Sequence, residues 1–470
     1  MCSIEETLID IETTKSRPSD KNCIKCKTSR ATILIRHSTY CKRCFQYMIV
    51  GKFRKNMEKY RTTNSQIGEK VMIGLSGGPS SRAMLQLLND YNETLPHEIS
   101  KKQLFADVLV CHIDESAIFD TQDSTMDRVK KIAQEYRYPF VGLPIENIFS
   151  ADYTSSGAYK EVLNVTFDQS KQQEINEFVA TVGQNDGHSN KEKLQLLLRG
   201  ISKLTAKEDF VWYLKQTLLI HTARRTGCTR LFLGDSSTRL SIKIISLTSK
   251  GRGFSLPLEI SGENQWFEDV SIARPMKDIT LKEICIYNHY LGFDNVFTSS
   301  LTSMLPPKAS IERLTEDFIV GLEKDYPSTV STITRTGSKL SIQNSVDKES
   351  HCMMCLMPYQ KGNKIWKNRI TVMRTPSLPS TKKMPTDQNA TICKNETSSC
   401  SQDACCSQND RTKFDQNVDI SDILCYACRV NMRDAKEIAL PPYVAEEAEK
   451  ENRRRKLRKH IEEFLIDDNE

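Results

Sequence analysis

The sequence predicts an α/β protein: a doubly wound, mainly parallel sheet flanked by N- and C-terminal zinc-knuckle modules. Strand-like and helix-like segments alternate between about residues 68 and 306, which is typical of a parallel sheet covered by helices. Four Cys-x-x-Cys pairs lie outside that stretch, two before it and two after it. The 38% hydrophobic fraction is low for a wholly globular chain, so part of the sequence is expected to be disordered.

The order of elements follows from hydrophobic patterning. The β-branched, apolar run Val71–Leu75 predicts a buried strand, and apolar residues at helical spacing follow it. A long helix is expected after a polar insertion near 165–195. The predicted strands cover 71–75, 107–113, 140–143 and 231–233, and the predicted helices cover about 80–91, 121–136 and 209–226.

The turn Ser76-Gly77-Gly78 follows the first strand and precedes a helix. Such a turn aims backbone N–H groups and a helix N-terminus at one point, which suits a phosphate, and glycine lets an anion approach closely. A plain turn is the alternative. No Lys or Asp lies in the turn to supply a cation or a metal ligand.

Two further strands end in polar residues. Asp114-Glu115-Ser116 follows the second strand, and Gly234-Asp235-Ser236-Ser237 follows the last. Each is weak evidence alone, because Asp and Gly often end strands in turns. Ligands of parallel sheets bind beyond the carboxyl ends of the strands, so the three ends predict one shared pocket. Its candidate residues are Ser76, Gly77, Gly78, Ser80, Ser81, Asp114 and Gly234.

The first two cysteine pairs have the spacing C-x2-C-x14-C-x2-C. Two such knuckles can close a tetrahedral thiolate site, so zinc bound by Cys23, Cys26, Cys41 and Cys44 is expected. His37 lies between the pairs and is expected at the surface.

The remaining pairs, Cys352/Cys355 and Cys425/Cys428, are far apart in sequence. The polar stretch over about 371–421 predicts a disordered insert, and a long insert adds little to the cost of closing the loop. A second zinc site from these four cysteines is therefore predicted. Cys393, Cys400, Cys405 and Cys406 lie in the insert, where free thiols are expected, and Cys228 and Cys285 are expected to be buried thiols.

Positive charge is concentrated near the N-terminus. Between Lys21 and Arg61 there are twelve basic residues and one acid, Glu58. A local excess beside a metal module favours nucleic acid over a merely solubilising surface. The candidate contacts are Lys25, Lys27, Arg30, Arg36, Lys42, Arg43, Arg54 and Lys55. No signal peptide or membrane span is recognised, so a soluble intracellular protein is expected, with cysteines as metal ligands or thiols.

The order of these motifs, with Arg274-Pro275 before the last two cysteine pairs, resembles that of the PP-loop ATP pyrophosphatases that thiolate tRNA. More closely, the chain resembles the cytoplasmic tRNA 2-thiolation protein 2 family. The resemblance covers Cys23 to Cys428 apart from two inserts. It implies cytoplasmic localisation and a heterodimer with the catalytic tRNA 2-thiolation protein 1. It also implies a tRNA substrate and sulfur from a thiocarboxylated ubiquitin-like carrier.

The chain departs from the active members at the turn. Active members read Ser-Gly-Gly-Lys-Asp-Ser, whereas Pro79 and Ser80 stand at the Lys and Asp positions here. Losing both side chains removes charge stabilisation from adenylyl transfer. Active members also carry cysteines for an iron–sulfur cluster, and nothing corresponds near Asp209, so a cluster is not expected in this chain. ATP and magnesium binding stay open, and no catalytic residue is assigned.

The expected organisation has six parts: a flexible N-terminus over 1–20, a basic zinc module over 21–62, the PP-loop-like domain over 68–306, a helical linker over 307–350, a second zinc module over 351–430 and a charged helical tail over 431–470. The leading hypothesis is a non-catalytic or weakly catalytic subunit required for 2-thiolation of the wobble uridine (mcm5s2U) in tRNA for Lys, Glu and Gln. One alternative is an ATP-dependent tRNA adenylyl- or sulfurtransferase in its own right. Another is a zinc-dependent tRNA-binding scaffold with no nucleotide role.

Overall fold

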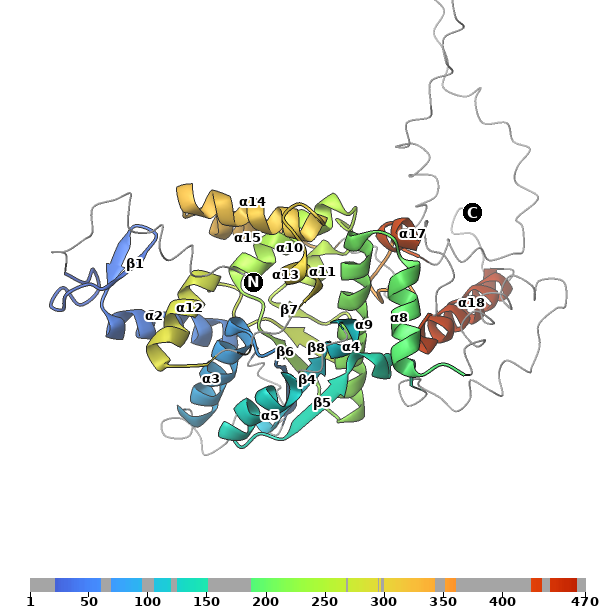
Figure 1. Ribbon diagram of the computed structural model, residues 1–470, viewed down its shortest axis with the longest axis horizontal. Helices are drawn as coiled ribbons and strands as arrows, with labels where there is room; N and C mark the ends of the chain where they lie inside the picture. Colours follow the sequence, from blue (N-terminus) through green and yellow to red (C-terminus); the bar gives the residue numbers. More distant parts are fainter. Residues whose placement is uncertain are drawn as a thin grey trace, which may run out of the picture.

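Figure 1 shows the computed structural model of the chain. It describes residues 22–60, 69–94, 105–119, 125–150, 187–267, 269–294, 296, 300–342, 351–360, 424–432 and 440–462. The predicted insert over 371–421, with its four cysteines, lies outside the described residues, as does the N-terminal segment over 1–20.

The central sheet has six strands in the order β5-β4-β3-β6-β8-β7. All neighbours are parallel except β7, which pairs antiparallel with β8 at one edge. The chain runs outward from β3 through β4 to β5 and then returns to the other side of β3 as β6, so the order reverses between β3 and β6. The strands are β3 Glu69–Gly74, β4 Phe105–Asp114, β5 Phe140–Pro144, β6 Arg230–Leu233, β7 Glu263–Asn264 and β8 Ser271–Ala273.

Helices cover both faces of the sheet, as predicted. Alternate residues of β3 enter different cores: Val71 and Ile73 pack with α2, α3, α5 and α12, whereas Met72 packs with α8 and α9. These helices are α2 Lys42–Glu58, α3 Pro79–Thr94, α5 Thr125–Glu135, α8 Asn190–Gly200, α9 Leu204–Arg225 and α12 Leu281–Leu291. Shorter or outer elements are α4 Ser116–Phe119, η3 Ile145–Phe149, α10 Ser237–Ser249, α11 Leu256–Ile260, α13 Leu301–Met304, α14 Ile311–Asp325 and α15 Thr329–Gly337.

Some boundaries differ from those expected. The long helix α9 starts at Leu204, five residues earlier than predicted, because Ala206 and Phe210 both reach the core. Strand β4 starts at Phe105, which is also buried. Residues 307–342 form α14 and α15, and both pack on α10.

The N-terminal cysteine module is joined to the sheet by α2. Its hairpin consists of β1 Ile33–Ile35 and β2 Ser38–Tyr40. Phe45, Ile49 and Phe53 recur every four residues of α2 and are buried in the core that covers one face of the sheet. An ion pair joins Lys52 to Glu283 of α12, with a nitrogen–oxygen distance of 2.7 Å.

The C-terminal elements pack on the opposite face of the sheet. They are α17 Tyr426–Met432 and α18 Pro442–Glu462, which Figure 1 places at the end of the molecule opposite β1. Tyr443 and Val444 of α18 share one core with Met353 and the sheet residue Met72. The first turn of α18 is therefore anchored, whereas Leu457 farther along is exposed. Within the part of the chain described, no helix is both long and apolar enough to cross a bilayer.

Candidate functional site

A cavity of about 850 Å³ lies at the carboxyl edge of the sheet, where the strand order reverses. All three predicted strand ends line it. The walls also include Trp212 and Lys215 of α9 and Glu316 of α14. Of the candidate residues, the lining contains Ser76, Gly78, Ser80, Ser81, Asp114 and Gly234.

Gly77 lies in the turn but does not line the cavity. Its φ of +84° is in the left-handed region, and an added Cβ would lie 3.0 Å from Val296 and 3.1 Å from Val129. Glycine is therefore required here by backbone conformation and by packing. The hydroxyl oxygens of Ser76 and Ser81 lie 3.2 Å apart, and the Ser81 hydroxyl donates to the Gly78 carbonyl. The turn keeps a compact shape without a charged side chain.

Gly234 allows β6 to approach the start of α3. A Cβ at this position would lie 3.0 Å from the backbone nitrogen and Cα of Ser81. Two of the predicted strand ends are therefore in van der Waals contact through glycine.

Each carboxylate that lines the cavity already has a partner. Asp114 accepts hydrogen bonds from the backbone N–H and hydroxyl of Ser116, at 3.1 and 2.9 Å. Glu115 lies 2.5 Å from the Lys215 ammonium. Glu316 pairs with Arg313 at 2.9 Å.

Asp235 belongs to a buried ion cluster. Its Oδ2 lies 3.0 Å from Lys243 Nζ and 3.1 Å from Arg274 Nε. Burial alone would raise the pKa of Asp235, but the two cations outweigh it and lower that pKa to about 2. Burial lowers the pKa of Lys243 in spite of Asp235, so Arg274 is the more secure counter-charge.

The cavity residues that were not singled out from sequence include His112, Arg128 and Lys215. His112 Nδ1–H donates a hydrogen bond to the Leu75 carbonyl at 2.8 Å, and burial lowers the pKa of the ring, which favours its neutral form. Its Nε2 has no hydrogen-bond partner among the described residues. Arg128 of α5 and Lys215 of α9 also line the cavity. These two cations come from helices, where no local motif marks them.

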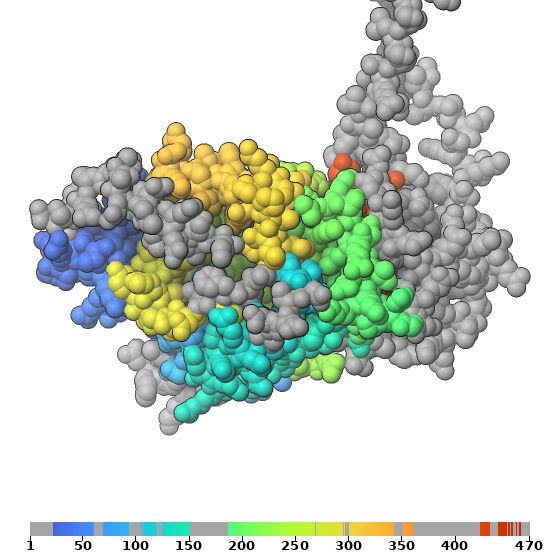
Figure 2. All heavy atoms as spheres, in the orientation of Figure 1, coloured from blue at the N-terminus to red at the C-terminus, as the bar shows by residue number. Residues whose placement is uncertain are grey.

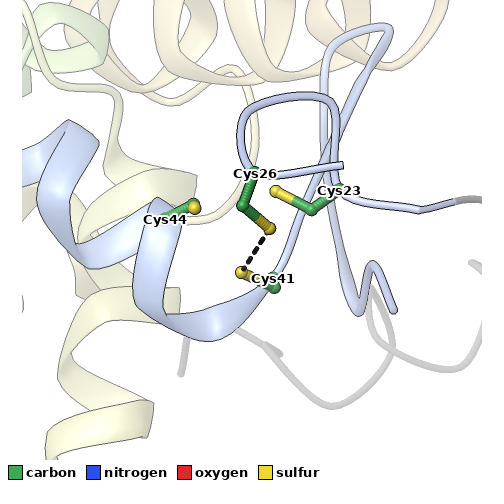
Figure 3. Close-up of side chains that lie close together, drawn as sticks. All are labelled: Cys23, Cys26, Cys41 and Cys44. Carbon is green, nitrogen blue, oxygen red and sulfur yellow. Dashed lines mark hydrogen bonds between the residues drawn. The ribbon is translucent and has the colours of Figure 1, made fainter. Parts of the chain in front are cut away.

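The four N-terminal cysteines converge as predicted. Their sulfur atoms all lie within 4.8 Å of one another, and Figure 3 shows them directed at a common point. The turn after Cys23 places Lys27 at φ 58°, and Cys41 directly precedes α2. Backbone and hydroxyl groups of Thr28 and Ser29 lower the pKa of Cys26 to about 5, whereas burial raises that of Cys44 to about 12. Four thiols in this arrangement fit a tetrahedral metal ion.

The C-terminal pairs also converge, although Cys355 and Cys425 are 70 positions apart. Cys352, Cys355, Cys425 and Cys428 have sulfur atoms within 4.8 Å of one another. Side chains from other parts of the chain fix the backbone around Cys355. Trp266 Nε1 donates to the Leu356 carbonyl and the Tyr443 hydroxyl donates to the Met354 carbonyl, both at 2.8 Å. The two knuckles can therefore share one ion, and either group of four could bind metal.

The other cysteines do not join these groups. Cys228 is buried, in agreement with expectation, whereas Cys285 is only half-buried, so its thiol is not the fully buried one predicted. Among the described residues, only the two sets of four cysteines bring three or more potential metal-ligand atoms within 4.8 Å of one another.

The basic residues of the N-terminal module lie on its surface. All eight candidates for nucleic-acid contact, Lys25, Lys27, Arg30, Arg36, Lys42, Arg43, Arg54 and Lys55, are exposed, as is His37. Tyr47, 57% exposed, lies beside Arg43, whose guanidinium is 5.7 Å from the ring centre. An aromatic ring among cations suits stacking on an unpaired base, a feature that charge counting missed. In Figure 2 this module, in blue, forms one end of the molecule.

Comparisons with known proteins identify the family. A sequence model of cytoplasmic tRNA 2-thiolation protein 2 matches residues 310–430. The protein of that name from Xenopus tropicalis is 32% identical, over 100% of this chain and 99% of its own length. The one from Homo sapiens is 30% identical over 97% of this chain and 95% of its own.

Some solved structures are similar to the chain as well. A U34-tRNA thiolase, NcsA from Methanococcus maripaludis with its 4Fe-4S cluster, is 17% identical, with a TM-score of 0.46 over 69% of this chain and 91% of its own. An NMN synthetase from Francisella tularensis gives a TM-score of 0.31 at 10% identity, over 65% of this chain and 99% of its own. On the strength of the full-length relatives, the chain belongs to the cytoplasmic tRNA 2-thiolation protein 2 family.

Proposed function

We propose that this chain is a non-catalytic subunit of the cytoplasmic tRNA thiolation enzyme, needed for 2-thiolation of the wobble uridine in tRNA for Lys, Glu and Gln. A role in tRNA thiolation follows from the family, whose name also places the chain in the cytoplasm. Its partner would be the catalytic tRNA 2-thiolation protein 1. The sulfur would come from a thiocarboxylated ubiquitin-like carrier.

The state of the sheet-edge cavity is the main support for a non-catalytic role. Adenylyl transfer needs cations or a metal at the phosphates. Pro79 and Ser80 supply neither, and Asp114, Glu115 and Asp235 are already hydrogen-bonded or ion-paired. A magnesium ion would have to compete with those partners for the carboxylates.

The remaining roles are assigned to the surface and to the cysteines. The basic N-terminal module would bind the tRNA backbone. Zinc is the ion that four thiolates at this spacing favour, and it would hold both knuckle pairs closed. The turn around Ser76, Gly78 and Ser81 would keep its shape for assembly, with weak ATP binding left as a secondary role of the site.

The test begins with deletion of the gene and measurement of 2-thiouridine in these three tRNAs by mass spectrometry. Unchanged thiolation would refute the proposal. The purified chain, given ATP and tRNA, should be inert alone and support thiolation when the partner is added. Activity of the chain alone would favour the independent enzyme.

A double variant tests the non-catalytic role within the sheet-edge cavity itself. Pro79→Lys with Ser80→Asp restores the two missing side chains. We expect it to stay inactive alone, because the surrounding carboxylates keep their partners. If nucleotide neither stabilises the native chain nor changes its tRNA affinity, a scaffold without a nucleotide role is favoured.

A further inference from the structure

A second cavity of about 210 Å³ adjoins the sheet-edge cavity. One of its walls is a single face of α9, formed by Glu208, Val211, Trp212 and Lys215 at helical spacing. The opposite wall comes from α13 and the first turns of α14. The two cavities share Glu115, Trp212, Lys215, Arg239 and Glu316.

Glu208 is the unexplained group in this cavity. It is only 8% exposed, and neither of its carboxyl oxygens has a hydrogen-bond partner among the described residues. Burial raises its pKa, and the nearby hydroxyls of Ser310 and Thr302 lower it by less. These hydroxyls lie near the carboxyl but do not complete a hydrogen bond of standard geometry, so a bound group that hydrogen-bonds to Glu208 would be stabilising.

The other charges of the cavity are satisfied. Lys215 pairs with Glu115 at 2.5 Å, Arg239 with Glu312 at 3.2 Å and Arg313 with Glu316 at 2.9 Å. Each cation of the lining is already paired with a carboxylate, so the cavity holds no unpaired cation among these lining residues to attract a bare anion. A neutral group with a donor and an acceptor side by side is the better match.

Trp212 adds an aromatic wall common to both cavities. The Lys243 ammonium lies 4.3 Å from its ring centre, so one face of the indole is occupied and a second ring would use the other face. Aromatic side chains beside hydrogen-bonding groups are how proteins hold bases taken out of a stack.

We propose that the cavity around Glu208 binds one unpaired pyrimidine base of RNA, with the Glu208 carboxyl hydrogen-bonded to the edge of the base and Trp212 against its ring. The Glu208 carboxyl can accept a hydrogen bond from the N3–H of uracil in either protonation state, and when protonated it can also donate to the adjacent C=O. This inference rests on the proposed role in tRNA binding and deepens it.

The test uses the full chain and two RNA probes, a uridine pentamer and the same pentamer with every uracil N3 methylated. Both carry the same backbone charge, so the basic surface binds them equally. Fluorescence anisotropy should show at least about tenfold tighter binding of the unmethylated pentamer, the value of roughly one to two hydrogen bonds. Equal binding of the two pentamers would overturn the inference.

Substitutions at Glu208 test whether this side chain causes the discrimination between the two pentamers. Glu208→Leu should abolish the discrimination, and it removes an unpaired buried acid, so the variant should fold. Glu208→Gln keeps a donor and an acceptor and should retain discrimination. Asp325→Asn is the matched control, because it removes an acidic side chain at an exposed position outside both cavities.

Two results would count against the inference. Discrimination that persists in Glu208→Leu would overturn it, and so would equal loss in the Gln and Leu variants. Either result would leave the proposed function standing if gene deletion still removes tRNA thiolation.

Discussion

Asp235 offers the sharpest test of how charges are arranged around the sheet-edge cavity. Its carboxylate is held between Lys243 and Arg274, so we expect Asp235→Asn to reduce stability rather than merely to empty a ligand site. Breaking a buried ion pair from one side costs about 3–5 kcal/mol, because the remaining charges stay buried. We therefore expect a loss of about 3 kcal/mol at pH 7.

The pH dependence of stability gives a second, independent value for what Asp235 contributes to the free energy of unfolding. The pKa of Asp235 is lowered from 3.8 to about 2 on folding, a difference of 1.8 pH units. At 1.36 kcal/mol per unit, its ionisation contributes about 2 kcal/mol to the free energy of unfolding. Because the pKa is lowered, this contribution is complete above pH 3.8 and is lost as the pH falls toward 2. At pH 3 the difference in free energy of unfolding between the native chain and Asp235→Asn should be smaller than at pH 7 by about 1 kcal/mol.

The assay is urea unfolding followed by circular dichroism at pH 7 and pH 3, with Asp325→Asn as the control for loss of an exposed charge. A cost below about 1 kcal/mol at pH 7, typical of exposed ion pairs, would refute the reasoning. A gap that stays constant between the two pH values would refute it as well.

Three further predictions concern the metal sites, the turn and the basic surface. Purified chain should carry two zinc ions by metal analysis, and Cys355→Ser should lower this to one, whereas Cys285→Ser leaves it unchanged. Gly234→Ala should cost about 1–3 kcal/mol in thermal unfolding, because the added methyl group would press on the α3 backbone. Gly78→Ala, which meets only a hydroxyl oxygen at 3.6 Å, should cost less, and equal costs would contradict the packing argument. Neutralising four exposed basic residues of the N-terminal module should weaken tRNA binding and reduce the salt slope by about 0.7–0.9 for each phosphate that is no longer neutralised, whereas an unchanged slope would exclude that surface.

Local patterns were sufficient for four of the six strands of the sheet and for the cysteine sites, whereas the short edge strands β7 and β8 were not predicted. The glycine turn and the strand ends at Asp114 and Gly234 share one cavity, because parallel strands end at one edge. The distant pairs around Cys355 and Cys425 meet, because loop closure grows slowly with length. These features depend on residue type and spacing, which a sequence displays directly.

Long-range partnerships were not predictable in the same way. Lys243 looks like an ordinary polar residue of a helix, yet it is buried against Asp235. Glu208 lies in α9, whose apolar residues predict only a face packed in the core. The burial of its carboxyl depends on α13 and α14, which lie across the cavity from it. Such pairings depend on which elements pack together, and hydrophobic periodicity does not specify that.

The placement of the second cysteine site has a consequence for biosynthesis. The first site closes within a span of 22 residues, so it can form soon after that span leaves the ribosome. The second waits for Cys425 and Cys428, and its knuckles are part of the core that covers Met72, Leu109 and Leu231 of the sheet. Helices α8 and α9 can cover part of that face earlier, but the part of its core that the knuckles and α18 complete stays open until synthesis is nearly finished, and chains elongate at about 5–20 residues per second. The nascent chain should therefore depend on chaperones, and on zinc supply late in translation, more than a chain whose fold was complete within its first 300 residues.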